Sequence, residues 1–313
     1  MVERKNEEDP KNMDQLIAKA EVLIESLPYI RRFAGKTFVI KYGGHAMVDE
    51  ELKKSVILDV IMLKYIGINP ILVHGGGKEI DHWMNKVGLE PTFSRGLRVT
   101  DKETMELAEM VLVGKVNRQI VSLINRYGGK AVGLSGKDSD LMVARKLPPQ
   151  SVQVDGEEEE IDLGQVGEVE KINPHLLTTL VEQNYIPVVS SIGKSYQEEE
   201  GADGLNINAD YVAGEMAAAL QAEKLILLTD VEGIMDDPGD PSTLVPTLSE
   251  DRAYTAIREG SINQGMIPKV ESCLKALYGG VSRTHIINGR VQHSLLLEIF
   301  TDKGIGTMVV RDE

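Results

Sequence analysis

The chain has 313 residues, of which 42% are hydrophobic and only 4% aromatic, with 30 glycines and a formal net charge of -15. This length allows a large core, and the preference for aliphatic over aromatic residues favours a layered α/β protein over a β-sandwich. The negative charge opposes binding to nucleic acid. The longest apolar runs, such as 225–228, are too short to span a bilayer.

One cysteine, Cys273, excludes an internal disulfide framework and fits a reducing compartment. The opening residues are charged and contain no apolar segment typical of a secretion signal. We therefore expect a cytoplasmic protein, with residues 1–12 disordered.

An amphipathic helix is predicted over residues 13–30. Asn12 or Asp14 would cap its start, and Pro28 would interrupt its end. This helix either packs on its own domain or is exchanged onto another subunit. Its apolar residues recur at intervals of three and four, at Leu16, Ile17, Ala20, Leu23, Ile24 and Leu27.

Beyond this helix, short apolar strands alternate with helices, which predicts a mainly parallel sheet covered on both faces. Ligands of such sheets bind beyond the carboxyl ends of the strands. The expected strands are 38–40, 71–73, 131–134, 186–190, 224–229, 285–287 and 307–310. The expected helices are 49–66, 78–87, 100–127, 174–184, 209–221, 249–259, 268–279 and 291–299.

Two regions depart from this simple alternation. Residues 143–172 alternate polar and apolar positions around an Asp-Gly pair, which predicts a hairpin with Glu157–Glu160 at an exposed tip. Residues 193–204 are polar and carry no predicted element. At the start of the helix 100–127, Thr100 is the expected cap, because a glutamate follows three residues later.

Two lysines near glycine turns are the strongest chemical signal. Lys41 follows a strand and precedes Gly43-Gly44, and Lys269 follows a glycine and a proline in GMIPKVE. Glycines let backbone N–H groups approach an oxygen closely, and a lysine supplies a mobile positive charge. A second strand ends in LVHGGG, where His74 would support the turn. Paired lysines and glycine turns predict phosphoryl transfer, although Lys269 could also be an ordinary solvated residue.

Several nucleotide-binding patterns are absent. Neither glycine turn fits the GxGxxG pattern of dinucleotide-binding folds, which disfavours a dehydrogenase. The GxxxxGK[ST] loop and the HRD and DFG motifs of protein kinases are missing as well. Any use of ATP must therefore rely on a different architecture.

Eight short blocks follow one another in a characteristic order. They are IKYGG (40–44), VHGGG (73–77), GLRVT (96–100), VGLSGKD (132–138), PVVSSIG (187–193), NINAD (206–210), LLTDVEGI (227–234) and GMIPKV (265–270). Together they resemble the amino-acid kinase family from about residue 13 to the C-terminus. Within it, the chain is similar to the branch that phosphorylates the γ-carboxylate of N-acetyl-L-glutamate in arginine biosynthesis.

The resemblance implies an open three-layer α/β/α fold with an additional N-terminal helix. Residues 1–30 would form a tail and an interlacing helix. Residues 31–195 would form a lobe that binds the acyl substrate and dimerises. Residues 196–313 would bind ATP, with Mg²⁺ held mainly by the nucleotide phosphates and not by a metal site of the protein, and would contain an arginine site.

The resemblance also implies roles for residues at the reacting phosphoryl group. Lys41 and Lys269 would contact this group from opposite sides, and Asp210 would position both lysines. Asp210 could instead simply cap the helix 209–221. A carboxylate nucleophile has a pKa of about 4 and is already ionised, so no general base is required. The glycines that would offer backbone N–H groups are Gly43 and Gly44 on the nucleotide side and Gly75 and Gly76 on the acyl side.

The resemblance also implies roles in ligand binding for three further residues. Arg98 would pair with a substrate carboxylate through two parallel hydrogen bonds, which lysine cannot make. Asn206 would bind the substrate backbone, with Asn208 as a competitor for that role. Asp230 would lie beside ATP.

Members of this branch that are inhibited by L-arginine carry a similar N-terminal helix, which interlaces with another dimer in a hexameric trimer of dimers. The tail HIINGRVQHSLLLEIFTDKGIGT resembles their arginine-binding segment. By position, Tyr29, His285, Glu298 and Gly304 would contact the inhibitor, and a PII-type protein is a conceivable regulator. The alternatives are a kinase of glutamate, aspartate, carbamate or an aminoadipate derivative, and a non-catalytic arginine-sensing protein.

Overall fold

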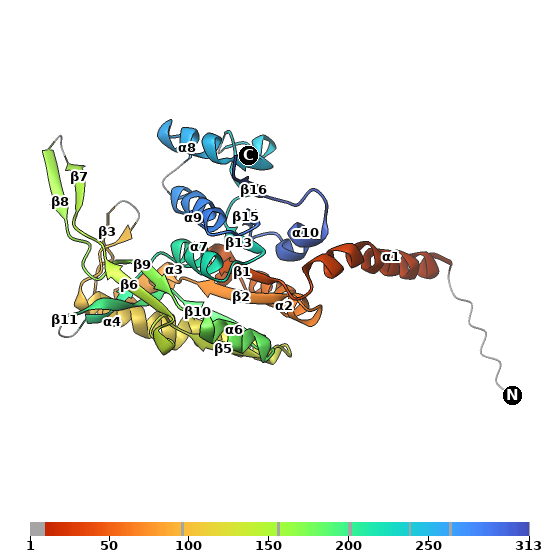
Figure 1. Ribbon diagram of the computed structural model, residues 1–313, viewed down its shortest axis with the longest axis horizontal. Helices are drawn as coiled ribbons and strands as arrows, with labels where there is room; N and C mark the ends of the chain where they lie inside the picture. The colour runs from red at the N-terminus through yellow and green to blue at the C-terminus, as the bar shows by residue number, and fades with distance from the viewer. Residues whose placement is uncertain are drawn as a thin grey trace.

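Within the described part of the chain, eight strands form a central sheet with helices on both faces (Figure 1). The computed structural model describes residues 10–94, 97–154, 157–199, 202–237, 239–262 and 265–312. In spatial order the strands are β14 (Thr247–Ser249), β16 (Thr307–Val310), β15 (Arg283–Asn288), β13 (Lys224–Thr229), β1 (Thr37–Tyr42), β2 (Asn69–His74), β10 (Ile186–Ser190) and β5 (Ala131–Leu134). Neighbours run parallel, except that β15 and β16 are antiparallel. The expected mainly parallel three-layer fold is confirmed.

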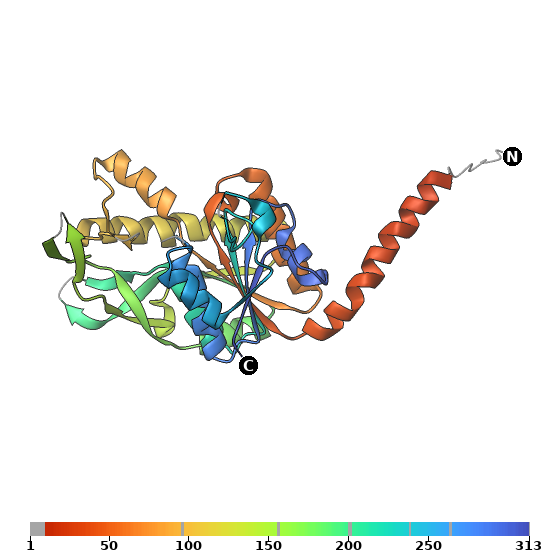
Figure 2. The ribbon, with the colours of Figure 1, turned by 90° about the horizontal axis from the view of Figure 1, so that it is seen from above.

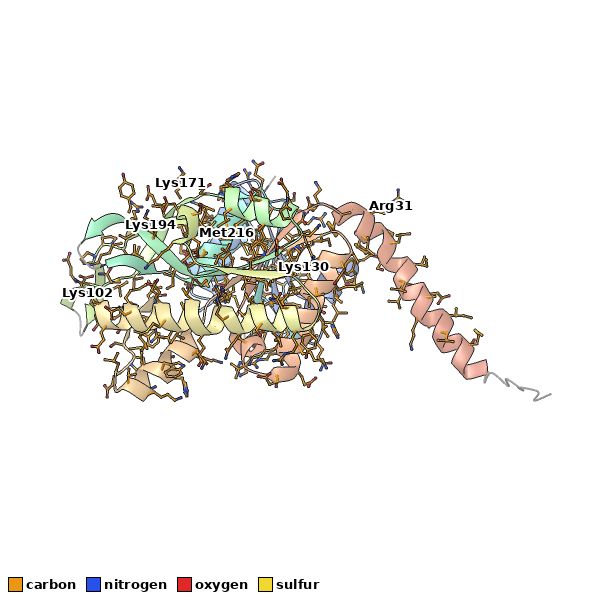
Figure 3. All side chains as sticks on the ribbon, turned by 90° about the horizontal axis from the view of Figure 1, so that it is seen from below. Arg31, Lys102, Lys130, Lys171, Lys194 and Met216 are labelled. Atoms are coloured by element: carbon orange, nitrogen blue, oxygen red, sulfur yellow. The ribbon has the colours of Figure 1, made fainter. Side chains whose placement is uncertain are left out.

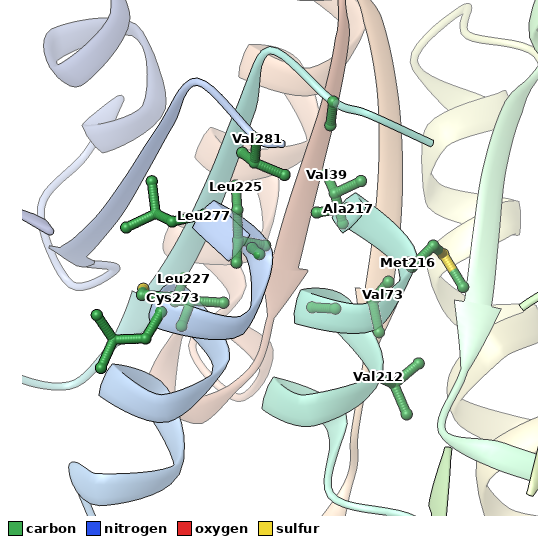
Figure 4. Packing of buried hydrophobic residues seen from close by; sticks show 14 of the residues in the cluster. Val39, Val73, Val212, Met216, Ala217, Leu225, Leu227, Cys273, Leu277 and Val281 are labelled. Carbon is green, nitrogen blue, oxygen red and sulfur yellow. The ribbon is translucent and has the colours of Figure 1, made fainter. Parts of the chain in front are cut away.

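Strand β1 shows how the alternation of side chains builds two cores. Val39 belongs to one buried cluster, and its neighbours Phe38 and Ile40 belong to the other. Helices α7 (Ala209–Ala219) and α9 (Ile267–Tyr278) cover the Val39 face (Figure 4). Helices α2 (Glu50–Tyr65), α5 (Asn117–Arg126) and α10 (Ser294–Phe300) cover the opposite face. Burying each large aliphatic side chain contributes about 1.5–3 kcal/mol to folding.

The long helix expected over residues 100–127 is present as three consecutive segments. They are α4 (Lys102–Glu109), the π-helical segment η2 (Met110–Val116) and α5, and they form one rod in Figure 3. The predicted cap was wrong by one residue. Asp101 accepts a hydrogen bond from the Thr104 amide at 2.8 Å, whereas Thr100 is buried and bridges to Gly164.

A second sheet lies beside the first and consists of β12 (Ala202–Asn206), β11 (Ile192–Glu199), β6 (Met142–Lys146) and β9 (Gly167–Ile172). Two of its strands, β11 and β12, lie in the polar stretch for which no element was predicted. Strand β11 pairs in parallel with the distant β6, a partner that the local sequence does not indicate.

The predicted hairpin within 143–172 is present as β7 (Gln150–Val154) and β8 (Glu157–Ile161), which project from the body (Figure 1). Its turn residues 155 and 156 lie outside the described residues. The acidic run Glu157–Glu160 starts directly after this turn and forms most of strand β8, and Glu160 is exposed. The direction of the other three glutamates stays a prediction.

Helix α1 (Pro10–Phe33) extends away from the body (Figure 2). It begins before the predicted start, and it continues through Pro28, so the expected interruption there was wrong. The predicted disorder of residues 1–12 was wrong for residues 10–12, which belong to α1, and residues 1–9 lie outside the described part. Much of the apolar stripe of α1 is exposed, for example 63% of Leu23 and 68% of Ile24.

The remaining described elements are short. They are η1 (Gly44–Met47), α3 (Gly77–Val87), β3 (Phe93–Ser94), β4 (Leu97–Arg98), η3 (Asp138–Asp140), α6 (His175–Glu182), η4 (Pro241–Thr243) and α8 (Glu250–Arg258). None of the described helices combines the length and the apolar composition that crossing a membrane would need.

Candidate active site

The first glycine turn begins where strand β1 ends and brings Lys41 close to its own backbone. A Cβ atom on Gly43 would lie 2.8 Å from Lys41 Nζ, so the lysine folds back over this residue. Gly44 has a φ of 69°, in the left-handed region that glycine tolerates best. A side chain there would also collide with the carboxylate of Asp230. Gly44 is therefore favoured by its backbone conformation as well as by close approach, whereas the neighbour of Gly43 is the end of a flexible lysine side chain.

Lys41 and Lys269 converge on the carboxylate of Asp210. Lys41 Nζ lies 3.1 Å from Oδ1, and Lys269 Nζ lies 2.7 Å from Oδ2. Burial alone would raise the pKa of Asp210, but the charges and hydrogen bonds of the two lysines hold it below its usual value. The carboxylate of Asp210 holds two ammonium groups side by side and offsets one of their two positive charges.

Asp210 is not the cap of α7, which removes the simpler explanation for its position. The cap is Asn208, whose side-chain oxygen accepts a hydrogen bond from the Asp210 amide at 2.8 Å. The side chain of Asp210 is only 5% exposed and is directed to the lysines. Since the Asn208 oxygen is engaged in capping, Asn206 has less competition for a ligand than the sequence indicated.

A cleft of about 450 Å³ opens next to Lys41 and Asp210. The predicted residues that line it are Lys41, Gly43, Gly44, Gly75, Gly76, Arg98, Asn206 and Asp210. Sequence reasoning missed Lys53, Gln119 and Ser191, which also line the cleft. Lys53 and Gln119 lie on helices α2 and α5, whose packing directs them inward, and Ser191 lies between strands β10 and β11. Lys269 and Asp230 are not part of the lining.

Arg98 is held rigidly at the cleft wall. Its Nη2 atom lies 2.6 Å from Asp81 Oδ1 and donates to the Gly77 carbonyl at 3.2 Å. Its guanidinium also lies over the Phe93 ring, 4.7 Å from the centroid. The residue is only 7% exposed. Asp81 was not predicted as its partner, and it orients the guanidinium before any ligand arrives.

Asn206 ends strand β12 beside the same cleft. Its side-chain amide donates to Thr100 Oγ1 at 3.4 Å, a long hydrogen bond. The backbone amide of Asn206 is fixed by the Gln165 carbonyl at 2.9 Å. The side chain is thus positioned at the lining while keeping hydrogen-bonding capacity.

Asp230 follows strand β13 and lies against the glycine turn. Its Oδ1 accepts a hydrogen bond from the His45 amide at 2.7 Å, and its Oδ2 lies 3.1 Å from His45 Nδ1. Burial favours a higher pKa for Asp230, yet the hydrogen bonds from His45 and the charge of Arg290 lower it. Asp230 thus connects the turn after β1 to the turn after β13.

His74 has the supporting position that the sequence indicated. It is completely buried, its Nδ1 lies 2.9 Å from the Gly75 carbonyl, and Asn117 Nδ2 lies 3.0 Å from its Nε2. Donation from Nδ1–H to the carbonyl and acceptance at Nε2 describe a neutral ring. Burial lowers the pKa of His74 to about 4, in agreement with this assignment.

A second cluster forms in the tail, away from the cleft. His285 Nδ1 lies 2.6 Å from Glu298 Oε1, and Glu298 Oε2 accepts a hydrogen bond from the Ile305 amide at 2.8 Å. Gly304 packs directly on this carboxylate, where a Cβ atom would lie 2.7 Å from Oε2. The structure therefore brings together three of the four residues expected at an arginine site.

The fourth, Tyr29, contacts the same region from helix α1. Its hydroxyl donates to Asp302, and its ring packs edge-on against Phe300 at 6.2 Å. Sequence reasoning missed Lys224, whose Nζ donates to His285 Nε2 at 3.0 Å. Burial lowers the pKa of Lys224 to about 8.

The described residues contain no group of three or more His, Cys, Asp or Glu side chains placed to hold a metal ion. The cleft instead offers ammonium groups, a guanidinium and glycine backbone. Such a site suits an anion.

Residues 36–288 match the amino acid kinase family. An acetylglutamate kinase of Moorella thermoacetica is 55% identical over 94% of this chain and 98% of its own length. Another from Methanocaldococcus jannaschii is 54% identical over 96% of this chain and 99% of its own.

Solved structures show the same architecture. N-acetylglutamate synthase of Neisseria gonorrhoeae, complexed with coenzyme A and N-acetyl-glutamate, is 29% identical with a TM-score of 0.78, over 94% of this chain and 64% of that longer chain. The same enzyme with coenzyme A and L-arginine is 28% identical with a TM-score of 0.73, over 94% and 65%. A Giardia lamblia carbamate kinase bound to AMP-PNP, at 16% identity and a TM-score of 0.63 over 89% and 99%, shares the fold.

Proposed function

The chain belongs to the amino acid kinase family, and we propose that it transfers the γ-phosphoryl group of ATP to the γ-carboxylate of N-acetyl-L-glutamate. Its full-length relatives at about 55% identity are named acetylglutamate kinases, which makes the chain a kinase enzyme. The observation that carries the proposal is the pair of lysines on Asp210 at the edge of an anion-binding cleft.

The reaction brings together two anions, so alignment and charge neutralisation dominate catalysis. A carboxylate oxygen of the acid forms a bond to the γ-phosphorus, and the bond from that phosphorus to the β,γ-bridging oxygen breaks. The electron pair leaves with ADP, and the product is an acyl phosphate. Lys41 would neutralise the transferring group from the acyl side and Lys269 from the nucleotide side. Asp210 would hold both ammonium groups in register.

Recognition of the acid would rest on the rigid wall of the cleft. Arg98, fixed by Asp81, would meet a substrate carboxylate with its remaining donors. Asn206 would bind the substrate backbone, and the amides of Gly75 and Gly76 would face its reacting end. Because Arg98 is ordered in advance, little side-chain entropy is lost on binding.

The nucleotide would bind beyond Gly43 and Gly44, beside Asp230. Mg²⁺ would be held through the nucleotide phosphates, where it neutralises charge on the phosphoryl oxygens. The backbone of the glycine turn and the ammonium group of Lys269 are the donors that this side provides. Residues 31–195 would then form the acyl lobe, and residues 196–313 the nucleotide lobe.

We assign the tail cluster to L-arginine as an allosteric inhibitor. Glu298 is a natural partner for a guanidinium, since a carboxylate accepts two parallel hydrogen bonds. Tyr29 places the end of helix α1 at this cluster. The exposed apolar stripe of α1 would be covered by the equivalent helix of another dimer, giving a hexamer.

A direct assay tests the substrate. The protein is incubated with ATP and hydroxylamine, and hydroxamate formation is measured for N-acetyl-L-glutamate, L-glutamate, L-aspartate, carbamate and N-acetyl-aminoadipate. We expect the highest kcat/KM for N-acetyl-L-glutamate. A preference for any other acid would overturn the substrate assignment, and no hydroxamate with any of them would favour a non-catalytic sensor.

A further inference from the structure

Helix α10 begins in an unusual way. Its first flanking residue, His293, has a φ of 57° and makes no side-chain cap bond to the helix. A left-handed backbone is disfavoured for residues other than glycine, so surrounding contacts must hold it. The His293 amide donates to Ser55 Oγ at 2.7 Å, and its Nδ1 lies 2.6 Å from Asp59 Oδ1. Ser55 and Asp59 of helix α2 therefore hold His293 in place, although α10 has no side-chain cap of its own.

Asp59 is central to this contact. Its carboxylate is completely buried and also faces the backbone amides of Leu295 and Leu296. An acidic group near a helix N-terminus interacts favourably with the helix dipole. Burial raises the pKa of Asp59 to about 6. Burying a carboxyl group costs free energy unless the group makes such contacts.

Arg290, three residues before His293, contacts a different part of the molecule, near the glycine turn. Its Nη2 lies 3.1 Å from His45 Nδ1, and its Nε lies 4.0 Å from Asp230 Oδ1. Asp230 in turn holds the His45 amide at the end of the glycine turn. The segment 289–294 thus contacts the glycine turn through Arg290 and helix α2 through His293.

The other end of α10 carries Glu298 of the tail cluster. Glu298 lies only four positions after Ser294, about one helical turn, so a shift at Glu298 moves the start of the helix as well. The glycine turn and helix α2 are consecutive in the chain, from Gly43 to Tyr65. Both contacts of the segment 289–294 therefore act on one continuous piece of backbone that begins at the reacting site.

We propose that the segment 289–294 ties the tail cluster to the glycine turn, with Asp59 and Arg290 as positioning residues for Gly43 and Gly44. The inference rests on the proposed function, because the glycine turn is assigned to the phosphoryl group. A ligand that binds at Glu298 more tightly in one position of helix α10 than in another would therefore alter the placement of Gly44. By reciprocity, occupation of the cleft would alter affinity at Glu298.

The link is tested by hydrogen exchange of the backbone amides of residues 43–49, followed by mass spectrometry on the full chain. The variants are Arg290→Gln and His293→Ala, whose side chains are about half exposed, together with Asp59→Asn at the buried position. The matched controls are Arg258→Gln on α8 and Glu51→Gln on α2, which remove the same charges elsewhere. We expect exchange to become about fivefold faster in the three variants, as for one lost hydrogen bond, and to stay unchanged in the controls.

Coupling to the tail is read by adding Glu298→Gln to the parent and to Arg290→Gln. Glu298→Gln is expected to speed exchange at residues 43–49 in the parent and to have little further effect with Arg290→Gln. Equal effects in both backgrounds, or none in the parent, would overturn the link. This readout needs no substrate, so it still decides the inference if the protein phosphorylates none of the acids tested.

The positioning role has its own readout. Arg290→Gln and His293→Ala should lower kcat roughly tenfold with smaller changes in both KM values, because a misplaced turn weakens the transition state more than substrate binding. Arg290→Lys should restore part of the loss by returning the charge near Asp230. Unchanged kcat in both variants would overturn the assignment of Arg290, and of Asp59 acting through His293, as positioning residues.

Discussion

The carboxylate of Asp210 and the ammonium group of Lys269 are 2.7 Å apart, and both side chains are almost enclosed by protein. In such an environment an ion pair is screened weakly, and its geometry is fixed. Lys41 reaches the other oxygen of the same carboxylate from strand β1. The carboxylate of Asp210 holds both ammonium groups in place, so little reorganisation is required when phosphoryl charge develops.

The first prediction concerns these two lysines. Lys41→Ala and Lys269→Ala should each lower kcat by ~10²-fold or more and raise the KM values less, because each lysine interacts most strongly with the transition state. Steady-state kinetics with N-acetyl-L-glutamate and ATP measure the effect. Lys54→Ala, on the exposed side of α2, is the matched control and should leave kcat unchanged. Near-normal turnover in either active-site variant would remove that lysine from the mechanism.

Local patterns in the sequence were enough to predict most of the central sheet. The apolar runs around Val39, Val73 and Leu225 indicate strands without knowledge of their neighbours, because both faces of a parallel strand are buried. Pro28 shows the limit of local rules, since helix α1 continues through it. Strand β11 could not be predicted from its polar residues, because its partner β6 lies far away in the chain.

The contacts of the candidate site were predictable where a motif names the residue, and less so where tertiary packing determines the partner. Lys41 and Asp210 were assigned by resemblance, and their ion pair is observed. Asp81 and Lys224 belong to no motif, and only the folded chain places them on Arg98 and His285. Contacts of this kind depend on the packing of whole helices and strands, which no local sequence window contains.

A second prediction addresses the acid substrate. Arg98→Lys keeps the positive charge but loses the planar fork and its contacts with Asp81 and the Gly77 carbonyl. The KM for N-acetyl-L-glutamate should rise about tenfold, as expected for the loss of one charge-assisted hydrogen bond, while the KM for ATP changes little. Arg145→Lys, at an exposed ion pair with Glu168, is the control. An equal rise in both KM values would place Arg98 elsewhere in the reaction.

The third prediction is a dependence of stability on pH that arises from His74. Burial lowers its pKa from 6.5 to about 4, so the unfolded chain binds a proton more readily than the folded protein between these values. Its contribution is fully present above pH 6.5 and is lost as the pH falls towards 4, by about 3 kcal/mol in total.

Urea unfolding between pH 4.5 and 7 tests this contribution. The parent should lose more stability on acidification than His74→Gln, which carries an amide in place of the ionisable ring. The comparison of slopes matters, because Asp59 changes stability in the opposite direction over part of this range. Its raised pKa favours the folded protein at low pH. Identical slopes in the two proteins would show that His74 is not buried in its neutral form.

The last prediction concerns helix α1. Its end is attached to the tail by the hydrogen bond from Tyr29 to Asp302 and by the ring contact with Phe300, while most of its apolar stripe is exposed. Deleting residues 1–30 should therefore convert the proposed hexamer to dimers, as measured by light scattering. The concentration of L-arginine for half-inhibition should rise by about tenfold or more, the scale of a lost coupling energy. Phosphoryl transfer should persist, because none of the described residues 10–30 lines the cleft. Deletion of residues 1–9 alone leaves α1 whole and should preserve both assembly and inhibition. A dimer in the intact protein, or an inhibition curve unaffected by the longer deletion, would contradict the role of α1 in regulation.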